Sequence, residues 1–351
     1  MGLSTPDSAK ILTAISGGDG PDITDDFHSN VPKYAEENIA IALDEYIAAD
    51  NINLDSIFVK EAYESNQWNG STYALPVSNN VMALYYNKDI LEAAGYTEIP
   101  GTMEELLEMC ADLTIVENGE VVQFGYPFMT QYLHQMIYAT GYDFGTADAV
   151  DITNDGVRTA LKTIVDVVDT YGDAVTNYIT SSKALVYSDQ DPFFLGQDVM
   201  RFDGNWIYTM GAKAGVNVGV AMIPGFADQG GKTFTTVSNS NFYIPSTAKN
   251  KDGAWDFMKF ITMGDGAKMF TISTGNQPAM KTLMDDQDVA AVFDEEGIVL
   301  KIMKESVLNY FPQMKDSSAY GTALESALDG AILGDSIEDI MAELQTVQDA
   351  N

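Results

Sequence analysis

The spacing of apolar residues predicts several amphipathic helices. In residues 155–171 one face is apolar and the pattern stops at Gly172, which is typical of a helix end: Val157, Leu161, Ile164, Val165 and Val168. Similar faces occur in residues 254–261, 323–328 and 340–347. Ser336 and Asp339 precede the last of these, and we expect them to form its N-terminal cap.

Strand-like runs alternate with these helices. Val216–Ile223 and Phe234–Ile244 are short runs rich in β-branched and aromatic residues, and Ala74–Asp89 contains two such runs in succession. This alternation predicts an α/β fold. A chain of 351 residues suggests two domains at about 150 residues each. Because we find no low-complexity linker, we expect strands to join the two lobes.

Polar residues interrupt the apolar run at Ser78, Asn79 and Asn80. A strand that leaves one core and enters another would expose its middle in a cleft, where the two amides could bind a ligand. A bulge at the protein surface explains the same pattern. The residues alone leave both interpretations open.

The charge of the chain narrows the range of partners. It has 18 basic and 52 acidic residues, a formal net charge of −34. Such a surface repels phosphate backbones and anionic lipid headgroups, so we expect no nucleic-acid or membrane-surface partner. With 46% hydrophobic residues the chain has enough apolar side chains to bury, and disorder is not expected.

Signatures of catalytic and metal sites are scarce. The two histidines, His28 and His134, belong to no recognisable catalytic or zinc motif. The single Cys110 follows a Thr102–Glu105 capping box at helical spacing, so we interpret it as a core thiol. The sequence therefore predicts no cofactor, no metal and no enzyme, although abundant carboxylates leave a carbohydrate-active enzyme with paired carboxylates as the alternative.

The acidic runs of the chain resemble cation sites only superficially. None has the twelve-residue spacing of an EF-hand loop, and we interpret them as solvated loops: residues 151–155, 189–191 and 294–296. The chain also contains no apolar run of 18 residues and no basic, apolar leader. We therefore predict no transmembrane segment and no signal peptide within it.

Four segments in order carry a family resemblance: Leu12–Ile23, Tyr73–Asp89, Met200–Trp206 and Val237–Phe260. Together they resemble the family 1 extracellular solute-binding proteins of ABC importers, the group that includes maltose-binding proteins. The resemblance implies a two-lobed periplasmic-binding-protein-like fold with an interlobe cleft that closes on a solute, commonly an oligosaccharide. It also implies that the chain crosses between the lobes several times.

The resemblance places these crossings at Ser78–Asn80, near Val237–Asn241 and near Gly275–Pro278. Lobe one would then comprise residues 1–78 and 236–275. Lobe two would comprise residues 79–235 and 276–351.

The resemblance further implies a set of ligand-binding residues. From lobe one and the crossings these are Asp26, Ser29, Asn30, Asn79, Asn80, Asn239 and Asn241. From lobe two they are Phe128, Gln131, Trp206 and Tyr320, although the family often has Trp at the last position. Aromatic rings and amides suit the apolar faces and hydroxyl rims of a sugar. Without the resemblance, the preferred interpretation of Trp206 is a core residue.

The resemblance also implies a location and partners. The partners would be a small carbohydrate and the permease subunits of an ABC transporter, with the protein itself a monomer. Only about ten residues precede Leu12, which is too few for the βαβ unit of about 30 residues with which family members begin. We therefore expect a chain shortened at its N terminus, with lobe one lacking that unit. Its signal segment and lipoprotein anchor would be missing too, and the protein would be periplasmic or anchored at the cell surface.

Overall fold

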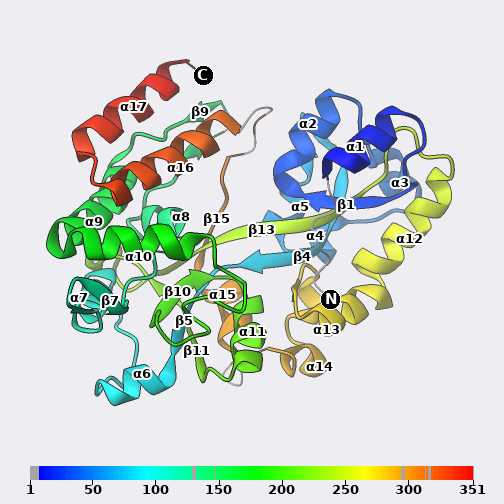
Figure 1. The fold of residues 1–351 in the computed structure, drawn as a ribbon. Coiled ribbons are helices and arrows are strands. Elements are labelled where there is room, and N and C mark those ends of the chain that lie inside the picture. Colours follow the sequence, from blue (N-terminus) through cyan, green and yellow to red (C-terminus); the bar gives the residue numbers. More distant parts are fainter. Residues whose placement is uncertain are drawn as a thin grey trace. The chain divides into compact units, whose positions relative to one another are not determined.

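The computed structural model describes residues 8–128, 132–146, 148–293, 297–312, 314 and 318–350. Helices and strands alternate along the chain, as an α/β fold requires, and they form two compact units (Figure 1). Unit 1 holds the described residues of Met1–Asn80, Val237–Leu300 and Gln313–Ser317. Unit 2 holds those of Val81–Thr236, Lys301–Pro312 and Ser318–Asn351.

Unit 1 contains short helices around part of a mixed sheet. Its helices are α1 (Ser8–Ser16), α2 (Val31–Glu36), α3 (Asp44–Ala49), α4 (Leu54–Ile57), α5 (Lys60–Glu64), α12 (Lys251–Met263), α13 (Asp265–Thr274), α14 (Gln287–Ala290) and the start of α15 (Ile298–Glu305), with the 3-10 turns η1 (His28–Asn30) and η3 (Lys281–Leu283). Its strands are β1 (Thr24–Phe27), β2 (Gln67–Trp68), β3 (Ser71–Thr72), β14 (Gln277–Pro278), and most of β4 (Ala74–Val81) and β13 (Thr233–Tyr243).

Unit 2 packs helices around a second, smaller sheet. Its helices are α6 (Lys88–Ala93), α7 (Met103–Asp112), α8 (Tyr132–Ala139), α9 (Asp155–Tyr171), α10 (Asp173–Lys183), α11 (Trp206–Ala214), α16 (Ser318–Leu333) and α17 (Ile337–Ala350), with the 3-10 turn η2 (Ala227–Gln229). Its strands are β5 (Ala83–Asn87), β6 (Ile115–Glu117), β7 (Glu120–Gln123), β8 (Gly145–Thr146), β9 (Ala149–Val150), β10 (Met200–Asp203), β11 (Val218–Ala221), β12 (Ile223–Pro224) and β15 (Val307–Asn309).

Two long strands carry the chain from one unit to the other. In unit 1 the strand order is β1-β13-β4-β14, and Asp26 on β1 pairs with Asn241 on β13. The first residues of β13 pair instead with β12 and β15 in unit 2. In unit 2 the order is β10-β5-β11, with both neighbours antiparallel to β5. At β4 and β13 the chain therefore passes between the units inside regular strands rather than through a loose linker.

The third crossing of the chain between the units lies after Leu300, and not near Gly275–Pro278 as the resemblance implied. Residues 276–300, which the sequence placed in lobe two, belong to unit 1. The reason is pairing: β14 joins β4, with Gln277 opposite Asn79, and α13 contacts both β14 and α14. The chain enters unit 2 again only after Leu300.

The helices with clear sequence signals form as predicted. Helix α9 is capped by Asn154, which accepts a hydrogen bond from Val157 N at 3.1 Å, and ends at Gly172 with a φ of 61°. Ser336 Oγ likewise accepts from Asp339 N at 3.2 Å at the start of α17. Cys110 in α7 is fully buried, and burial raises the pKa of its thiol, so it is the core thiol that the sequence predicted.

Helix α1 near the N terminus contributes apolar side chains to unit 1. Ile15 in α1 is only 3% exposed, while Leu12 and Ile23 are half-buried. Ile15 packs in a cluster of unit 1 with Tyr34 and Tyr243. Its helix therefore covers part of the apolar face of this unit.

Candidate functional site

Trp206 stands at the start of α11, directly after β10. All four residues of β10 are buried, and Gly204 and Asn205 lead from the strand into the helix. The indole folds back over Gly204: a Cβ atom added there would lie 2.2 Å from the ring atoms Cζ3 and Cη2. Trp206 as a whole is half-buried. Gly204 therefore serves to bring the backbone close to the ring.

Replacing Gly204 by Ala is expected to lower the free energy of unfolding by about 1–3 kcal/mol, because the new methyl group overlaps the indole. Gly321→Ala is the matched control, since a Cβ there meets nothing within 4 Å and lies in helix α16. Urea unfolding of both variants measures the difference. Equal midpoints for the two variants would show that the ring moves away without cost.

A buried cluster of charged side chains is centred on Arg201 of β10, the strand that precedes Trp206. Arg201 on β10 is fully buried and binds Asp191 with both arms of its guanidinium, Nη1 to Oδ2 at 3.0 Å and Nη2 to Oδ1 at 2.6 Å. Asp198 Oδ2 lies 3.6 Å from Nη2, and Asp203 Oδ2 lies 3.9 Å from Nη1. The guanidinium also stacks over Phe193, with its Cζ atom 5.0 Å from the ring centroid. One cation therefore serves three buried carboxylates.

The electrostatics of the cluster follow from this imbalance. Burial raises the pKa of Asp198 to about 6, although Arg201 and the hydroxyl of Tyr178 favour its ionised form. Burial opposes the charge of Arg201, but the hydrogen bond to Asp191 and the charge of that carboxylate outweigh it and raise the pKa of the guanidinium. These carboxylates are fully buried, so they offer no accessible acid–base pair.

The sequence missed this cluster. It placed Asp191 in a solvated loop, whereas Asp191 is fully buried because both its oxygens bind Arg201. The available signal was an arginine inside the strand-like run Met200–Asp203, since a buried charge needs a partner. A buried arginine predicts that carboxylates pair with it, but it does not identify which Asp or Glu residues these are.

On β4, Ser78, Asn79 and Asn80 are 0%, 0% and 7% exposed. All of β4 is buried, which excludes the alternative of a surface bulge. Asn79 Nδ2 donates to the carbonyl oxygen of Pro278 on β14 at 3.0 Å. This amide therefore ties two strands of unit 1 together, and ligand contact by Asn79 and Asn80 stays a prediction.

Asn239 belongs to a buried polar network in unit 1. Its side-chain nitrogen donates to the carbonyl of Ala62 at 3.0 Å and to Ser65 Oγ at 2.5 Å, and its backbone N–H donates to His28 Nδ1 at 3.1 Å. Burial lowers the pKa of His28 to about 4, so the imidazole is neutral and Nδ1 can accept.

Asn241, which is 1% exposed, continues this network. With its amide oriented to satisfy its neighbours, Asn241 accepts from His28 N at 2.9 Å and lies against Asn66. The donors of Asn239 and the oxygen of Asn241 are thus already used within unit 1. A ligand contact by either residue stays a prediction.

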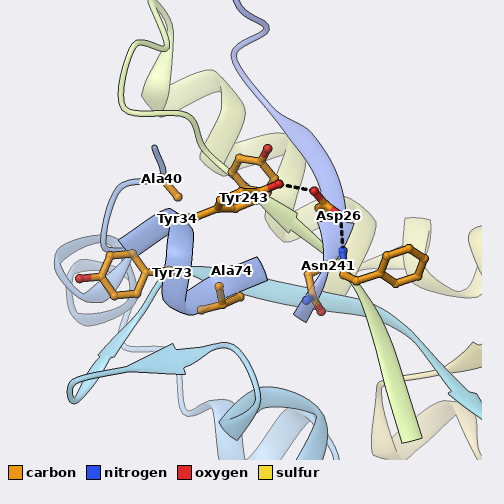
Figure 2. Close-up of a pocket in the computed structure, with 9 residues that line it drawn as sticks. Asp26, Tyr34, Ala40, Tyr73, Ala74, Asn241 and Tyr243 are labelled. Atoms are coloured by element: carbon orange, nitrogen blue, oxygen red, sulfur yellow. Dashed lines mark hydrogen bonds between the residues drawn. The ribbon is translucent and has the colours of Figure 1, made fainter. Parts of the chain in front are cut away.

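Asp26 is the centre of a second polar group. Its carboxylate accepts from the Tyr34 hydroxyl, as Figure 2 shows. It also accepts from Phe27 N at 2.7 Å and from Asn30 Nδ2 at 3.0 Å. The adjoining pocket in unit 1 has a volume of about 10 Å³, which is enough for a single water and too small for a sugar. Ser29 beside it is exposed and Asn30 is half-buried.

Two further predicted residues, Phe128 and Tyr320, lie in unit 2. Phe128 is 3% exposed and packs edge-on against Tyr132, with ring centroids 4.5 Å apart, so it contributes to an aromatic core. Tyr320 on α16 is 6% exposed. Gln131 lies outside the described residues. The structure neither assigns nor removes a ligand contact for these three.

Within the described part of the chain, no group of three or more His, Cys, Asp or Glu side chains is arranged to hold a metal ion. Among the same residues, no helix has the length and apolar character needed to cross a membrane.

Comparison with solved structures identifies the fold. The chain superimposes on CpMnBP1 with mannotriose bound with a TM-score of 0.82, at 24% identity over 97% of this chain and 88% of that one. It superimposes on an ABC substrate-binding protein of Listeria monocytogenes in complex with cycloalternan with a TM-score of 0.80, at 21% identity over 98% and 87%. The predicted two-lobed α/β fold of periplasmic sugar-binding proteins is thereby confirmed.

Sequence relatives agree with this fold. The chain is 25% identical to a maltotriose-binding protein of Pyrococcus abyssi over 290 residues, which is 81% of this chain and 60% of the relative. It is 21% identical to a galactooligosaccharide-binding protein of Bacillus subtilis over 297 residues, 80% of this chain and 66% of that protein. The chain thus spans less than two thirds of the length of these relatives.

The profile that describes bacterial extracellular solute-binding proteins matches residues 4–293, which is most of the chain. The resemblance found in the four sequence segments is therefore confirmed: the chain belongs to the bacterial extracellular solute-binding protein family.

Proposed function

We propose that the protein binds a carbohydrate, an oligosaccharide in particular, outside the cytoplasm and delivers it to the permease of an ABC transporter without chemical change. The observation that carries the proposal is a half-buried tryptophan at the β10–α11 junction in a chain of this family. An indole with one face packed on Gly204 and part of its surface open is suited to stack on the apolar face of a sugar ring.

The printed names of the relatives support this class of ligand. They include a maltotriose-binding and a galactooligosaccharide-binding protein, and solved neighbours hold mannotriose and cycloalternan. In our proposal Trp206 stacks on the sugar, while Asn80 and the exposed Ser29 and half-buried Asn30 are candidates to bind its hydroxyls. We also propose that the protein acts as a monomer at the cell surface or in the periplasm.

Trp206→Ala is expected to weaken sugar binding by about 1–3 kcal/mol, or roughly 5- to 150-fold, because it removes an aromatic anchor. Maltotriose, mannotriose and cycloalternan serve as probes, first by thermal shift and then by isothermal titration calorimetry. Trp68→Ala is the control, since Trp68 lies on β2 of unit 1, where its indole donates to Glu36 at 2.8 Å. A Trp206→Ala protein that binds as tightly as the parent chain would remove Trp206 from the site.

The alternative is a carbohydrate-active enzyme, and the same protein distinguishes the two. Reducing-sugar release from any of these probes would identify an enzyme and contradict our proposal. A thermal shift with no release supports a binding protein. Neither shift nor release across a wide panel of oligosaccharides would contradict carbohydrate binding by this chain.

A further inference from the structure

Two hairpins of the chain turn on the same dipeptide. Strands β2 and β3 are joined by Asn69-Gly70, and strands β6 and β7 by Asn118-Gly119. The asparagine and the glycine both have positive φ, 49° and 82° in the first turn and 54° and 83° in the second. Positive φ at both central residues is what a type I′ turn requires. The backbones of the two turns are therefore alike, and differences in their reactivity come from the surroundings of each asparagine.

An Asn-Gly dipeptide carries its own modifying reaction. The backbone nitrogen of the glycine attacks the asparagine side-chain carbon Cγ. A bond forms between these two atoms, the bond from Cγ to Nδ2 breaks, and ammonia leaves with the proton of the glycine amide. Water then opens the five-membered imide at either of its carbonyl groups, which yields aspartate or isoaspartate. Glycine favours the attack because it has no Cβ to hinder the approach of the side chain.

Asn69 is held against the rotation that this attack requires. Its Nδ2 atom donates to Glu36 Oε1 at 3.2 Å, and the same oxygen accepts from the indole of Trp68 at 2.8 Å. Glu36 is the last residue of α2, and β2 contacts that helix. For Cγ of Asn69 to reach the nitrogen of Gly70, the hydrogen bond to Glu36 must break.

Asn118 has no comparable restraint. The residue is exposed, and its side chain makes no hydrogen bond within the described part of the chain. Next to it Glu117 lies opposite Glu120 in the strand pairing, and like charges that face each other weaken a hairpin. The corresponding pair of the other hairpin, Trp68 opposite Ser71, carries no charge. The side chain of Asn118 is therefore freer to reach the geometry of attack.

We propose that Asn118 is a site of spontaneous deamidation and that Glu36 protects Asn69 from the same reaction. The product adds one negative charge to a chain whose formal net charge is already −34. Isoaspartate also lengthens the main chain by one atom within the tight turn between β6 and β7, so it disturbs the pairing of this hairpin. The proposal does not depend on the proposed function.

The experiment incubates the full chain at mildly alkaline pH and follows both asparagines by peptide mapping with mass spectrometry, which detects the replacement of an amide by an acid. In the folded protein Asn118 is expected to react about fivefold faster than Asn69, the factor that one hydrogen bond contributes. In the urea-unfolded chain the two rates are expected to converge, because both asparagines precede glycine. No reaction at Asn118, equal or faster reaction at Asn69 in the folded protein, or a difference that persists in urea would overturn the proposal.

Glu36→Ala tests the protection of Asn69. The variant is expected to speed the reaction at Asn69 about fivefold and to leave the rate at Asn118 unchanged. Glu37→Ala is the matched control, because Glu37 is the exposed residue that follows Glu36 at the end of α2, and it is expected to change neither rate.

Glu36→Gln keeps a side-chain oxygen that can accept from Asn69, so it is expected to retain part of the protection. An unchanged rate at Asn69 in Glu36→Ala, or an equal increase in both alanine variants, would overturn the role of Glu36. Urea unfolding checks that each variant is folded.

Discussion

Replacing Arg201 by Met is expected to lower the free energy of unfolding by about 3–5 kcal/mol at neutral pH. The side chain is fully buried, and its loss leaves three carboxylates in the interior without their cation: Asp191, Asp198 and Asp203. Met replaces the aliphatic part of the arginine, so the loss comes chiefly from the uncompensated charge. Urea unfolding followed by circular dichroism measures it.

Arg158→Met is the matched control, because Arg158 is the other arginine of the chain and lies exposed on α9. We expect a change within about 0.5 kcal/mol there. The deficit of Arg201→Met should also shrink as the pH falls, since the stranded carboxylates can then take up protons. Equal stability of the two variants at neutral pH would contradict the role of Arg201 as the cation of the cluster.

Local features explain what the sequence could predict. The cap and end of α9 depend on Asn154 and Gly172, which are adjacent in sequence to the helix that they bound. The capping hydroxyl of Ser336 acts three residues away, on Asp339. Such signals are complete within a few residues, so periodicity and capping chemistry are enough to find them.

Other features of the fold and of the candidate site depend on contacts between residues far apart in the sequence, and these could not be predicted from the sequence. Residues 276–300 belong to unit 1 because β14 pairs with β4, about 200 positions earlier in the chain. Two or three residues of such a strand carry no period of their own. Of the candidate site, the family resemblance predicted Trp206, but the close approach of its ring to Gly204 depends on side-chain torsions that no sequence pattern reports.

The same limit applies to the hydrogen-bonding residues. Ligand binding by Asn239 and Asn241 was predicted from the family resemblance and stays a prediction. In the structure both residues join a buried network with His28. The burial of Asp191 was absent from the prediction because it depends on the pairing with Arg201, which is ten residues further along the chain.

Asp198→Asn is expected to make the protein more stable above pH 7. Burial raises the pKa of Asp198 from 3.8 to about 6 in the folded chain, so the folded state holds the proton more tightly than the unfolded state does. The stability that this group contributes is therefore present at about pH 4 and is lost as the pH rises through 6. The shift of roughly two pKa units corresponds to about 3 kcal/mol.

Asparagine stays neutral at every pH and keeps an oxygen that can accept from Tyr178, while Asp191 remains as the principal partner of Arg201. The variant should therefore lose the fall in stability between pH 4 and pH 7 that Asp198 causes. Urea unfolding at a series of pH values measures this difference, with Asp189→Asn as the control, since Asp189 is exposed in the same loop. The prediction fails if the free energy of unfolding depends on pH in the same way in Asp198→Asn and in the parent chain. Asp198 would then be ionised in the folded protein without cost, because Arg201 and Tyr178 compensate its burial in full.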